Sequence, residues 1–208
     1  MIPPYLDLDA LRTITMSFPT YLDLMERQAA VPEEQIPPEE REHWTYLPLN
    51  LHRTRRILRS FAPPAELADL LSRIDGPRFW LVLTEPWCGD SAQCLPYIVR
   101  LAETSPRVEL GLVLRDEHPE VMDRFLTAGK RSIPVLAALA PDGRVVWRWG
   151  PRPAAAQAVF DAARDEGLPR EKILERLHLW YGRDRGRHLL AELRDVIVRH
   201  EELAGTGD

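Results

Sequence analysis

Cysteine is scarce in this chain: its 208 residues include only two, Cys88 and Cys94. So few cysteines exclude a framework of disulfide bonds, and in a reducing compartment such a pair more often takes part in chemistry than in crosslinking. Long apolar runs are also missing, because the longest extend over about six to eight residues whereas a membrane-spanning helix needs about 20. We therefore expect no transmembrane segment.

An excess of positive charge is missing as well. The 27 lysine and arginine residues are outnumbered by 32 aspartate and glutamate residues, which gives a formal net charge of −5. This balance provides no general attraction to nucleic acid or to an anionic membrane surface, so we expect neither as a partner. The first residues lack the basic and then apolar pattern of a secretory signal, and the sequence therefore predicts a cytoplasmic protein.

What is present is the composition of a folded globular protein, with 45% hydrophobic and 28% charged residues. A chain of this length can bury a substantial core. Between residues 6 and 30 apolar side chains recur mostly every three or four positions, which predicts an amphipathic helix that Pro19 interrupts. Helical patterns follow at 39–60 and 65–74. We expect residues 1–75 to form a helical N-terminal extension.

At Phe79 the pattern changes to that of a buried strand, which ends at Thr84. Further along the chain we expect a helix, a strand, a helix, two strands and a helix at about 89–104, 108–114, 119–126, 134–139, 144–149 and 153–166. The helix between the first two strands makes them parallel, and the turn Pro141-Asp142-Gly143 makes the last two antiparallel. This βαβαββα order over 76–166 predicts an α/β protein with a thioredoxin fold, followed by C-terminal helices at 167–208.

The segment from Trp87 to Ser91, Trp-Cys-Gly-Asp-Ser, places Cys88 between the first strand and the next helix. Free amide N–H groups and the positive end of the helix dipole at such a position favour a thiolate, which predicts a lowered pKa for Cys88. Asp90 acts in the opposite direction. A buried cysteine is often only a small packing residue, but this position favours a nucleophile. For Ser91 two interpretations stay open: a hydrogen bond to the thiolate, or a helix cap.

The sequence Trp-Cys-Gly-Asp-Ser resembles the Trp-Cys-Gly-x-Cys active site of thioredoxins. The resemblance puts Cys88 at the attacking position and Ser91 where the resolving cysteine stands in the family. Ile133-Pro134 resembles the element with a cis-proline that faces this cysteine, which implies a cis bond before Pro134.

A closer resemblance is to bacterial thioredoxin-like proteins that have a helical N-terminal extension and a Trp-Cys-Gly-Asp motif. It is carried by Leu-Thr-Glu-Pro-Trp-Cys-Gly-Asp-Ser-Ala-Gln and by the segments at 46–50, 114–117, 129–134, 149–153 and 179–181. This resemblance implies the fold and the attacking cysteine with more force than it implies a substrate.

Cys94 does not stand at the resolving position. On a continuous helix the Cα atoms of residues six apart lie roughly 10 Å from each other, and a disulfide tolerates only about 7 Å. We therefore expect no bond between Cys88 and Cys94 in the resting protein, and we interpret Cys94 as a buried structural residue. Local unwinding of the helix, as in some peroxiredoxins, would let Cys94 act as a resolving cysteine.

The predicted topology brings further residues to the edge of the sheet where Cys88 lies. We expect a substrate groove there, formed by Trp87, Gly89, Asp90, Arg115, Arg131, Ser132, Ile133, Trp149 and Arg152. Its three arginines would form a positive patch that binds an anionic partner or stabilises the thiolate. The alternative is that Arg115 pairs with an acidic neighbour while Arg131 and Arg152 are solvated.

No metal and no cofactor are expected, because the histidines are scattered and the two cysteines do not have the spacing of a zinc site. The patterns together predict a thiol–disulfide redox protein. Cys88 would form a mixed disulfide with a protein or a low-molecular-weight thiol partner. One alternative is a redox-inactive binding or adaptor protein with the same fold. A second is a peroxidase, but no activating pair is recognisable around Thr84 and Cys88. No pattern indicates an oligomeric state.

Overall fold

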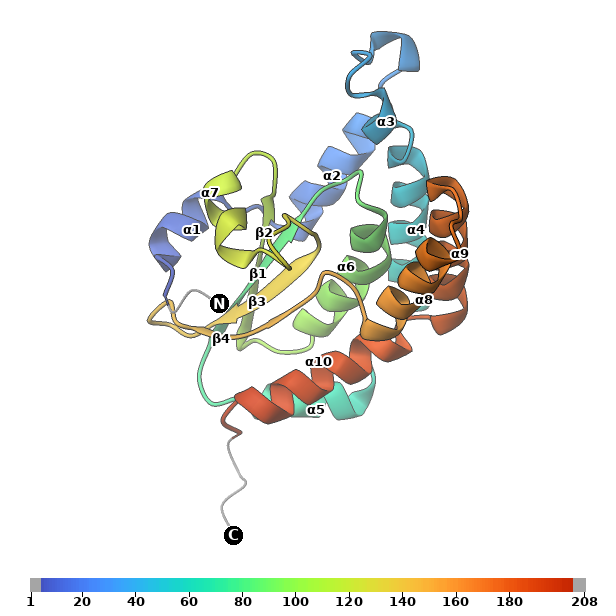
Figure 1. The fold of residues 1–208 in the computed structure, drawn as a ribbon. Coiled ribbons are helices and arrows are strands. Elements are labelled where there is room, and N and C mark those ends of the chain that lie inside the picture. The colour runs from blue at the N-terminus through green and yellow to red at the C-terminus, as the bar shows by residue number, and fades with distance from the viewer. Residues whose placement is uncertain (1–4, 204–208) are drawn as a thin grey trace.

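A four-stranded sheet lies at the centre of the computed structural model, which describes residues 5–203 (Figure 1). The ends of the two expected extensions, 1–4 and 204–208, lie outside the described residues. The strands are β1 (Arg78–Thr84), β2 (Val108–Leu114), β3 (Val135–Leu139) and β4 (Val145–Trp149), in the order β2-β1-β3-β4. The parallel pairing of β1 with β2 and the antiparallel pairing of β3 with β4 confirm the pairings expected from their connections.

Helices cover both faces of this sheet (Figure 1). They are α1 (Leu8–Ile14), α2 (Phe18–Ala29), α3 (Arg41–Trp44), α4 (Leu47–Ser60), α5 (Ala65–Ser72), α6 (Gly89–Ala102), α7 (Pro119–Met122), α8 (Ala154–Asp165), α9 (Arg170–Asp184) and α10 (Arg187–His200), with short 3-10 turns at Glu33–Gln35 and Asp123–Phe125. This is the predicted α/β architecture with helical extensions. None of the helices within 5–203 is long and apolar enough to cross a membrane.

The two faces of the sheet bury two different cores, because successive strand residues point to opposite sides. Trp80 and Val82 face the larger core, which helices α2, α4, α5, α6, α9 and α10 complete. Phe79 and Leu81 face the smaller core, which is closed by α1 and α7. Figure 1 shows α1 and α7 together on one side of the sheet and the other helices on the opposite side. Burial on both faces explains why β1 is a continuous apolar run.

The first apolar segment forms two helices, and Pro19 does not interrupt a helix. It occupies the first turn of α2, where its missing N–H has no intrahelical partner to lose. Ser17 caps this helix by accepting the Thr20 N–H at 3.3 Å. Between α1 and α2 the chain is extended, and Met16 exchanges two backbone hydrogen bonds with Leu112 of β2, at 2.8 and 2.9 Å. The break is therefore set by pairing with the sheet.

Residues 31–46 form an arm that projects from the body between α2 and α4 (Figure 1). The Trp44 indole N–H donates to the carbonyl of Val31 at 3.1 Å and so ties the two ends of the arm together. Glu42 forms an ion pair with Arg170 of α9 at 2.5 Å. The arm thus joins the N-terminal helices to the C-terminal ones near the loop after β1.

Candidate functional site

Cys88 caps the N-terminus of α6 and is in extended conformation, with φ −76° and ψ 115°. Its Sγ accepts the backbone N–H of Ser91 at 3.4 Å, and the thiol donates to the carbonyl of Ile133 at 3.5 Å. The Ile133–Pro134 peptide bond is cis. Cys88, Ser91 and the Ile133-Pro134 segment therefore lie together, although 45 residues separate Ile133 from Cys88 in the sequence.

The electrostatic setting of Cys88 differs from the one expected. Its side chain is buried, with the residue 7% exposed, and this burial raises the pKa of the Cys88 thiol to about 11. The Asp90 carboxylate contributes to the increase, while the N–H groups of the helix start lower the pKa only in part. The predicted lowered pKa is wrong for this structure, because desolvation of the thiolate outweighs the effect of the helix start.

Ser91 contacts Cys88 through its backbone. Its Oγ is buried and has no hydrogen-bond partner among the described residues, although its proximity acts to lower the pKa of Cys88. The cap of α6 is Cys88 itself, so the interpretation of Ser91 as the cap is wrong. Removal of the hydroxyl would leave the backbone contact intact.

Trp87 lies beside Cys88 and is held by the arm and by the loop after β2. The imidazole ring of His43 stacks on it, with ring centroids 4.2 Å apart and an angle of 11° between the planes. The Arg115 guanidinium lies 4.6 Å from the Trp87 centroid and forms hydrogen bonds of 2.8 and 3.1 Å to Asp116. The pairing of Arg115 with an acidic neighbour is thereby confirmed.

Two helices outside the central sheet hold the backbone of the loop. From α4, the Asn50 amide donates to the carbonyl of Pro86 at 3.1 Å and accepts from Arg53 at 2.9 Å. From α9, His178 packs on Gly89 so closely that a Cβ at this glycine would lie 2.7 Å from the imidazole ring. Burial, with the nearby arginines, lowers the pKa of His178 to about 3, so the ring is neutral at physiological pH.

Asp90 anchors the opposite side of the loop. It accepts hydrogen bonds of 2.6 Å from the Tyr181 hydroxyl and from the Arg152 guanidinium, which also lies 4.6 Å from the Phe160 ring centroid. Burial raises the pKa of Asp90, and Arg152 and Tyr181 lower it part of the way back. The Cys94 thiol donates weakly to the same Tyr181 oxygen, at 3.9 Å.

With this geometry in place, comparison with known proteins decides the family. The model of the thioredoxin family matches residues 40–164, which is more than half of the 208 residues. The chain belongs to the thioredoxin family. The match begins within the N-terminal helical region and ends in α8, so it includes Cys88 and Pro134.

Two solved structures share the fold of this thioredoxin-family chain at 20% sequence identity. A protein of unknown function from Pseudomonas aeruginosa has a TM-score of 0.58, with 91% of this chain and 95% of that one covered. An HIV epitope-scaffold has a TM-score of 0.57, with 93% and 99% covered. At this identity the likeness shows the fold alone. No curated protein sequence matches the chain.

The three arginines of this thioredoxin-family protein do not converge on the sulfur. Arg115 is bound to its acidic neighbour, and Arg131 forms an exposed pair of 2.6 and 2.7 Å with Asp123. Arg152 is mostly buried against Asp90, so its expected solvation is also wrong. Arg115 and Arg152 lie beside the loop, over Trp87 and against Asp90, but each of the three guanidinium groups is paired with a carboxylate, so they do not form an unpaired positive patch at Cys88.

Trp149 also lies elsewhere than predicted. It faces the larger core and donates its indole N–H to Glu192 of α10 at 2.7 Å, whereas Cys88 belongs to the smaller core on the other face of the sheet. The side chain that β4 turns toward one face depends on its register with β3, which the sequence pattern does not determine. Ser132 is half-buried and immediately precedes Ile133.

Cys94 is fully buried on the larger-core side of α6, and both cysteines are free. The predicted absence of a bond between Cys88 and Cys94 is confirmed. Burial raises the pKa of Cys94 well above its ordinary value. The helix runs without a break from Gly89 to Ala102, so the two thiols point into different cores.

Four residues around the loop were not singled out from the sequence: Asn50, Glu85, His178 and Tyr181. Asn50, Glu85 and Tyr181 lie in segments that carry the family resemblance, at 46–50, 83–93 and 179–181, which was the available signal, and His178 lies in none of them. Glu85 stands three residues before Cys88, and its carboxylate accepts the Asp116 N–H at 2.8 Å. Burial raises the pKa of Glu85 to about 7. Among the described residues no three His, Cys, Asp or Glu side chains gather as metal ligands.

Proposed function

We propose that this protein carries out thiol–disulfide exchange through Cys88. The observation that supports the proposal most is the position of Sγ at the start of α6, between the Ser91 N–H and the carbonyl before the cis bond to Pro134. The backbone edge at Ile133 would pair with an extended segment of a partner and bring its sulfur to Cys88. Membership of the thioredoxin family is consistent with a redox role.

The exchange has two steps. The Cys88 thiol first loses its proton, and the thiolate attacks one sulfur of a partner disulfide, so that a mixed disulfide forms while the other sulfur leaves as a thiolate and takes up a proton. A second thiol, protein-borne or of low molecular weight, then attacks the mixed disulfide and releases Cys88. Ser91 stands where a resolving cysteine would be, so this second thiol comes from outside the active-site motif.

The raised pKa of the Cys88 thiol limits the rate of the first step. With a pKa of about 11, about one Cys88 in ten thousand is a thiolate at pH 7. We expect exchange by the free protein to be slow at neutral pH and to accelerate as pH rises. The proposal includes a cytoplasmic location, which the two unpaired cysteines support. It also includes membership in the Trp-Cys-Gly-Asp group, with the segments 1–75, 76–166 and 167–208 as its three parts.

The test is formation of a mixed disulfide with bis(2-hydroxyethyl) disulfide at pH 8.5, followed by intact mass spectrometry. We expect one adduct on the parent and on Cys94→Ser, and none on Cys88→Ser. A thiol added afterwards should remove the adduct. An adduct located on Cys94 in the folded parent would contradict the assignment of Cys88 as the attacking residue.

The second candidate is a binding or adaptor protein without redox chemistry. It is favoured by the raised pKa of Cys88 and by Ser91 at the resolving position. The same experiment separates the two candidates. A folded parent that forms no adduct within hours at pH 8.5, while the unfolded chain reacts, would favour the adaptor.

A further inference from the structure

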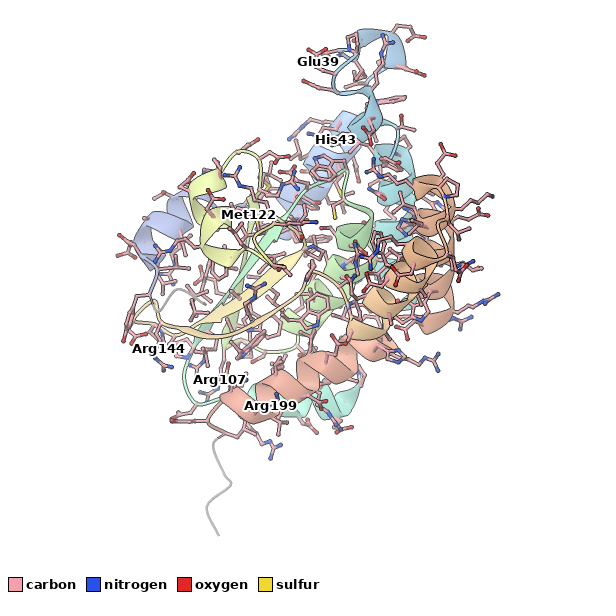
Figure 2. All side chains as sticks on the ribbon, in the orientation of Figure 1. Glu39, His43, Arg107, Met122, Arg144 and Arg199 are labelled. Carbon is pink, nitrogen blue, oxygen red and sulfur yellow. The ribbon has the colours of Figure 1, made fainter. Side chains whose placement is uncertain are left out.

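A hollow of about 330 Å³ lies between the arm and the loop that carries Cys88. Figure 2 shows His43 at the base of the arm and Glu39 near its tip. Apolar side chains of Val31, Ile36 and Leu47 line part of the hollow. The chain therefore builds a concave surface next to the reactive loop from residues of the N-terminal extension.

The rest of the lining combines aromatic rings with carboxylates. Trp44 supplies an indole ring, and Trp87 a second one whose faces His43 and Arg115 cover. Glu40 and Glu85 supply carboxylates, Gln28 and His43 complete the lining, and no lysine or arginine is among the described residues that line the hollow. Aromatic faces and carboxylates both attract cations, and a ring face with a nearby carboxylate recognises alkylammonium and guanidinium groups. An anion placed here would meet two carboxylates, while Arg115 over Trp87 is already paired with Asp116. The chemistry of the lining thus selects for positive charge.

Glu85 is the most informative of these side chains, because it is 6% exposed yet only partly satisfied. Its Oε1 accepts the Asp116 N–H at 2.8 Å, and its Oε2 has no hydrogen-bond partner among the described residues. Oε2 keeps access to solvent, because the buried side-chain atoms without a partner among the described residues are Trp80 Nε1, Ser91 Oγ, Arg100 Nε and Arg152 Nε. Because Glu85 lines the hollow and its Oε2 is open to solvent, a ligand N–H in the hollow could bind this oxygen.

No charged group among the described residues forms a hydrogen bond with the Oε2 of Glu85. Arg115 is the nearest cation, and its guanidinium is bound to Asp116 and stacked over Trp87. Asp116 and Glu117 place further negative charge near Glu85 and act to raise its pKa. Above pH 7 the Glu85 carboxylate is ionised, and no lysine or arginine among the described residues that line the hollow neutralises it.

We propose that this hollow binds an organic cation, an alkylammonium or guanidinium group carried by the thiol or disulfide partner of Cys88. The Glu85 carbonyl accepts the Cys88 N–H at 3.1 Å, so the wall of the hollow and the reactive cysteine belong to one turn of the backbone. A partner sulfur at Cys88 with a basic group a few bonds away can therefore occupy both places. This inference rests on the proposed exchange at Cys88 and adds the charge of its substrate.

The first experiment compares three small disulfides that differ in charge: cystamine, bis(2-hydroxyethyl) disulfide and dithiodiglycolate. The rate of adduct formation at Cys88 of the folded protein is divided by the rate with the unfolded chain, which cancels the intrinsic reactivity of each disulfide. We expect this ratio to be about tenfold higher for cystamine than for the neutral disulfide, as for a carboxylate that meets a partly desolvated cation. Dithiodiglycolate should have the lowest ratio.

Substitutions in the hollow then test which residues cause the preference for cystamine. In Glu85→Gln the amide oxygen still accepts the Asp116 N–H, so the shape is kept and the charge is lost; the preference for cystamine should fall to about twofold or less. Glu40→Gln should reduce it by a smaller factor. Glu39→Gln is the matched control, because Glu39 is exposed on the same arm and does not line the hollow. It should keep the parental preference.

A second readout does not depend on redox chemistry. Calorimetric titration of Cys88→Ala with hexylammonium should show binding that Glu85→Gln weakens severalfold, and hexanol should bind less well. If no disulfide reacts with Cys88 but hexylammonium binds as described, the exchange function fails and the cation site stands. If all three disulfides react with equal ratios and hexylammonium binds no better than hexanol, the cation site is overturned and the exchange function stands.

Lysine side chains of proteins and small aminothiols both carry an alkylammonium group. A disulfide-linked peptide with lysine two residues from its cysteine is therefore compared with the same peptide carrying norleucine. A faster reaction of the lysine peptide than of cystamine assigns the site to protein partners, and the reverse assigns it to small aminothiols. Equal rates for the lysine and norleucine peptides, with no preference for cystamine, would contradict the proposal.

Discussion

The two sides of the loop at the start of α6 are held in different ways. On one side Cys88 is held by backbone groups, the Ser91 N–H and the Ile133 carbonyl, at 3.4 and 3.5 Å. On the other side Asp90 is held by charged and hydroxyl side chains, Arg152 and Tyr181, both at 2.6 Å. The sulfur thus has weak partners that a substrate can replace, while the strong contacts lie behind it.

The difference follows from where the partners come from. The groups around Cys88 belong to the βαβαββα core that the thioredoxin family shares. Tyr181 and His178 come from α9, and Asn50 comes from α4, so the helical extensions hold the loop from behind. We infer that the extensions fix the loop so that the cysteine can react without loss of the local fold.

The largest expected effect concerns the reactivity of Cys88. Alkylation by iodoacetamide requires the thiolate, so its rate should rise about tenfold per pH unit and about a thousandfold between pH 7 and pH 10. Rates are measured by mass spectrometry on Cys94→Ser. A plateau already at pH 8 would show a thiol pKa near 8 and contradict the dominance of burial.

The substitution Asp90→Asn tests whether the charge on the Asp90 side of the loop acts on Cys88. The Asp90 carboxylate contributes to the raised pKa of Cys88, so its replacement by a neutral amide should lower that pKa and speed alkylation at pH 8 severalfold. Asp116→Asn is the control, because the groups that shift the pKa of Cys88 are its burial, Asp90 and Ser91, and not Asp116. An unchanged rate in Asp90→Asn would show that the two sides are electrostatically independent.

The next effect is on stability. Arg152→Ala leaves the buried Asp90 carboxylate without its ion-pair partner, whose side chain is 16% exposed, and should reduce the free energy of unfolding by about 3 kcal/mol. Arg131→Ala removes the exposed pair with Asp123, which solvent screens, and should change the free energy of unfolding far less. Urea unfolding measures both. Equal losses for the two variants would mean that the buried pair does not anchor the loop.

Gly89→Ala probes the contact between the loop and α9. An added Cβ would lie 2.7 Å from the ring of His178, so the variant should lose about 2 kcal/mol of stability through overpacking. The double variant Gly89→Ala/His178→Ala removes the imidazole ring that the added Cβ would contact. It should be more stable than the sum of the two single changes predicts, and strict additivity would show that the contact is not tight.

Much of the fold, and the Cys88 side of the site, could be predicted from the sequence. The continuous apolar run of β1 and the turn at Pro141-Asp142-Gly143 fix strands locally, and the Trp-Cys-Gly motif marks the helix start. The Asp90 side could not be predicted, because Tyr181 is 91 residues from Asp90 and no local pattern links them. Burial, the main cause of the raised pKa of Cys88, likewise depends on packing from distant segments.

The positions of Arg131 and Trp149 were predicted wrongly for two different reasons. Topology placed Arg131 at the correct edge of the sheet, but a long side chain pairs with the nearest carboxylate, here Asp123. Trp149 was also placed at this edge by topology, as the end of the last strand, but its side chain faces the opposite core. The topology thus predicts which loops meet at an edge of the sheet, but it does not predict which way their side chains point.

The smallest expected effect is a pH dependence of stability caused by Glu85. Burial favours its neutral form in the folded protein, with a pKa of about 7 against 4.5 as the ordinary value. A raised carboxyl pKa contributes stability that is complete below pH 4.5 and is lost as pH rises through 7. The full shift corresponds to about 3 kcal/mol between pH 4.5 and pH 8, which solvent in the adjoining hollow screens, so Glu85→Gln should gain about 1 kcal/mol of unfolding free energy relative to the parent over this interval. Urea unfolding at these two pH values measures the difference, with Glu39→Gln as a control that should show none. A relative loss of stability for Glu85→Gln over this interval would mean that the folded protein prefers the carboxylate, as it would if a cation of the chain itself already occupied the hollow.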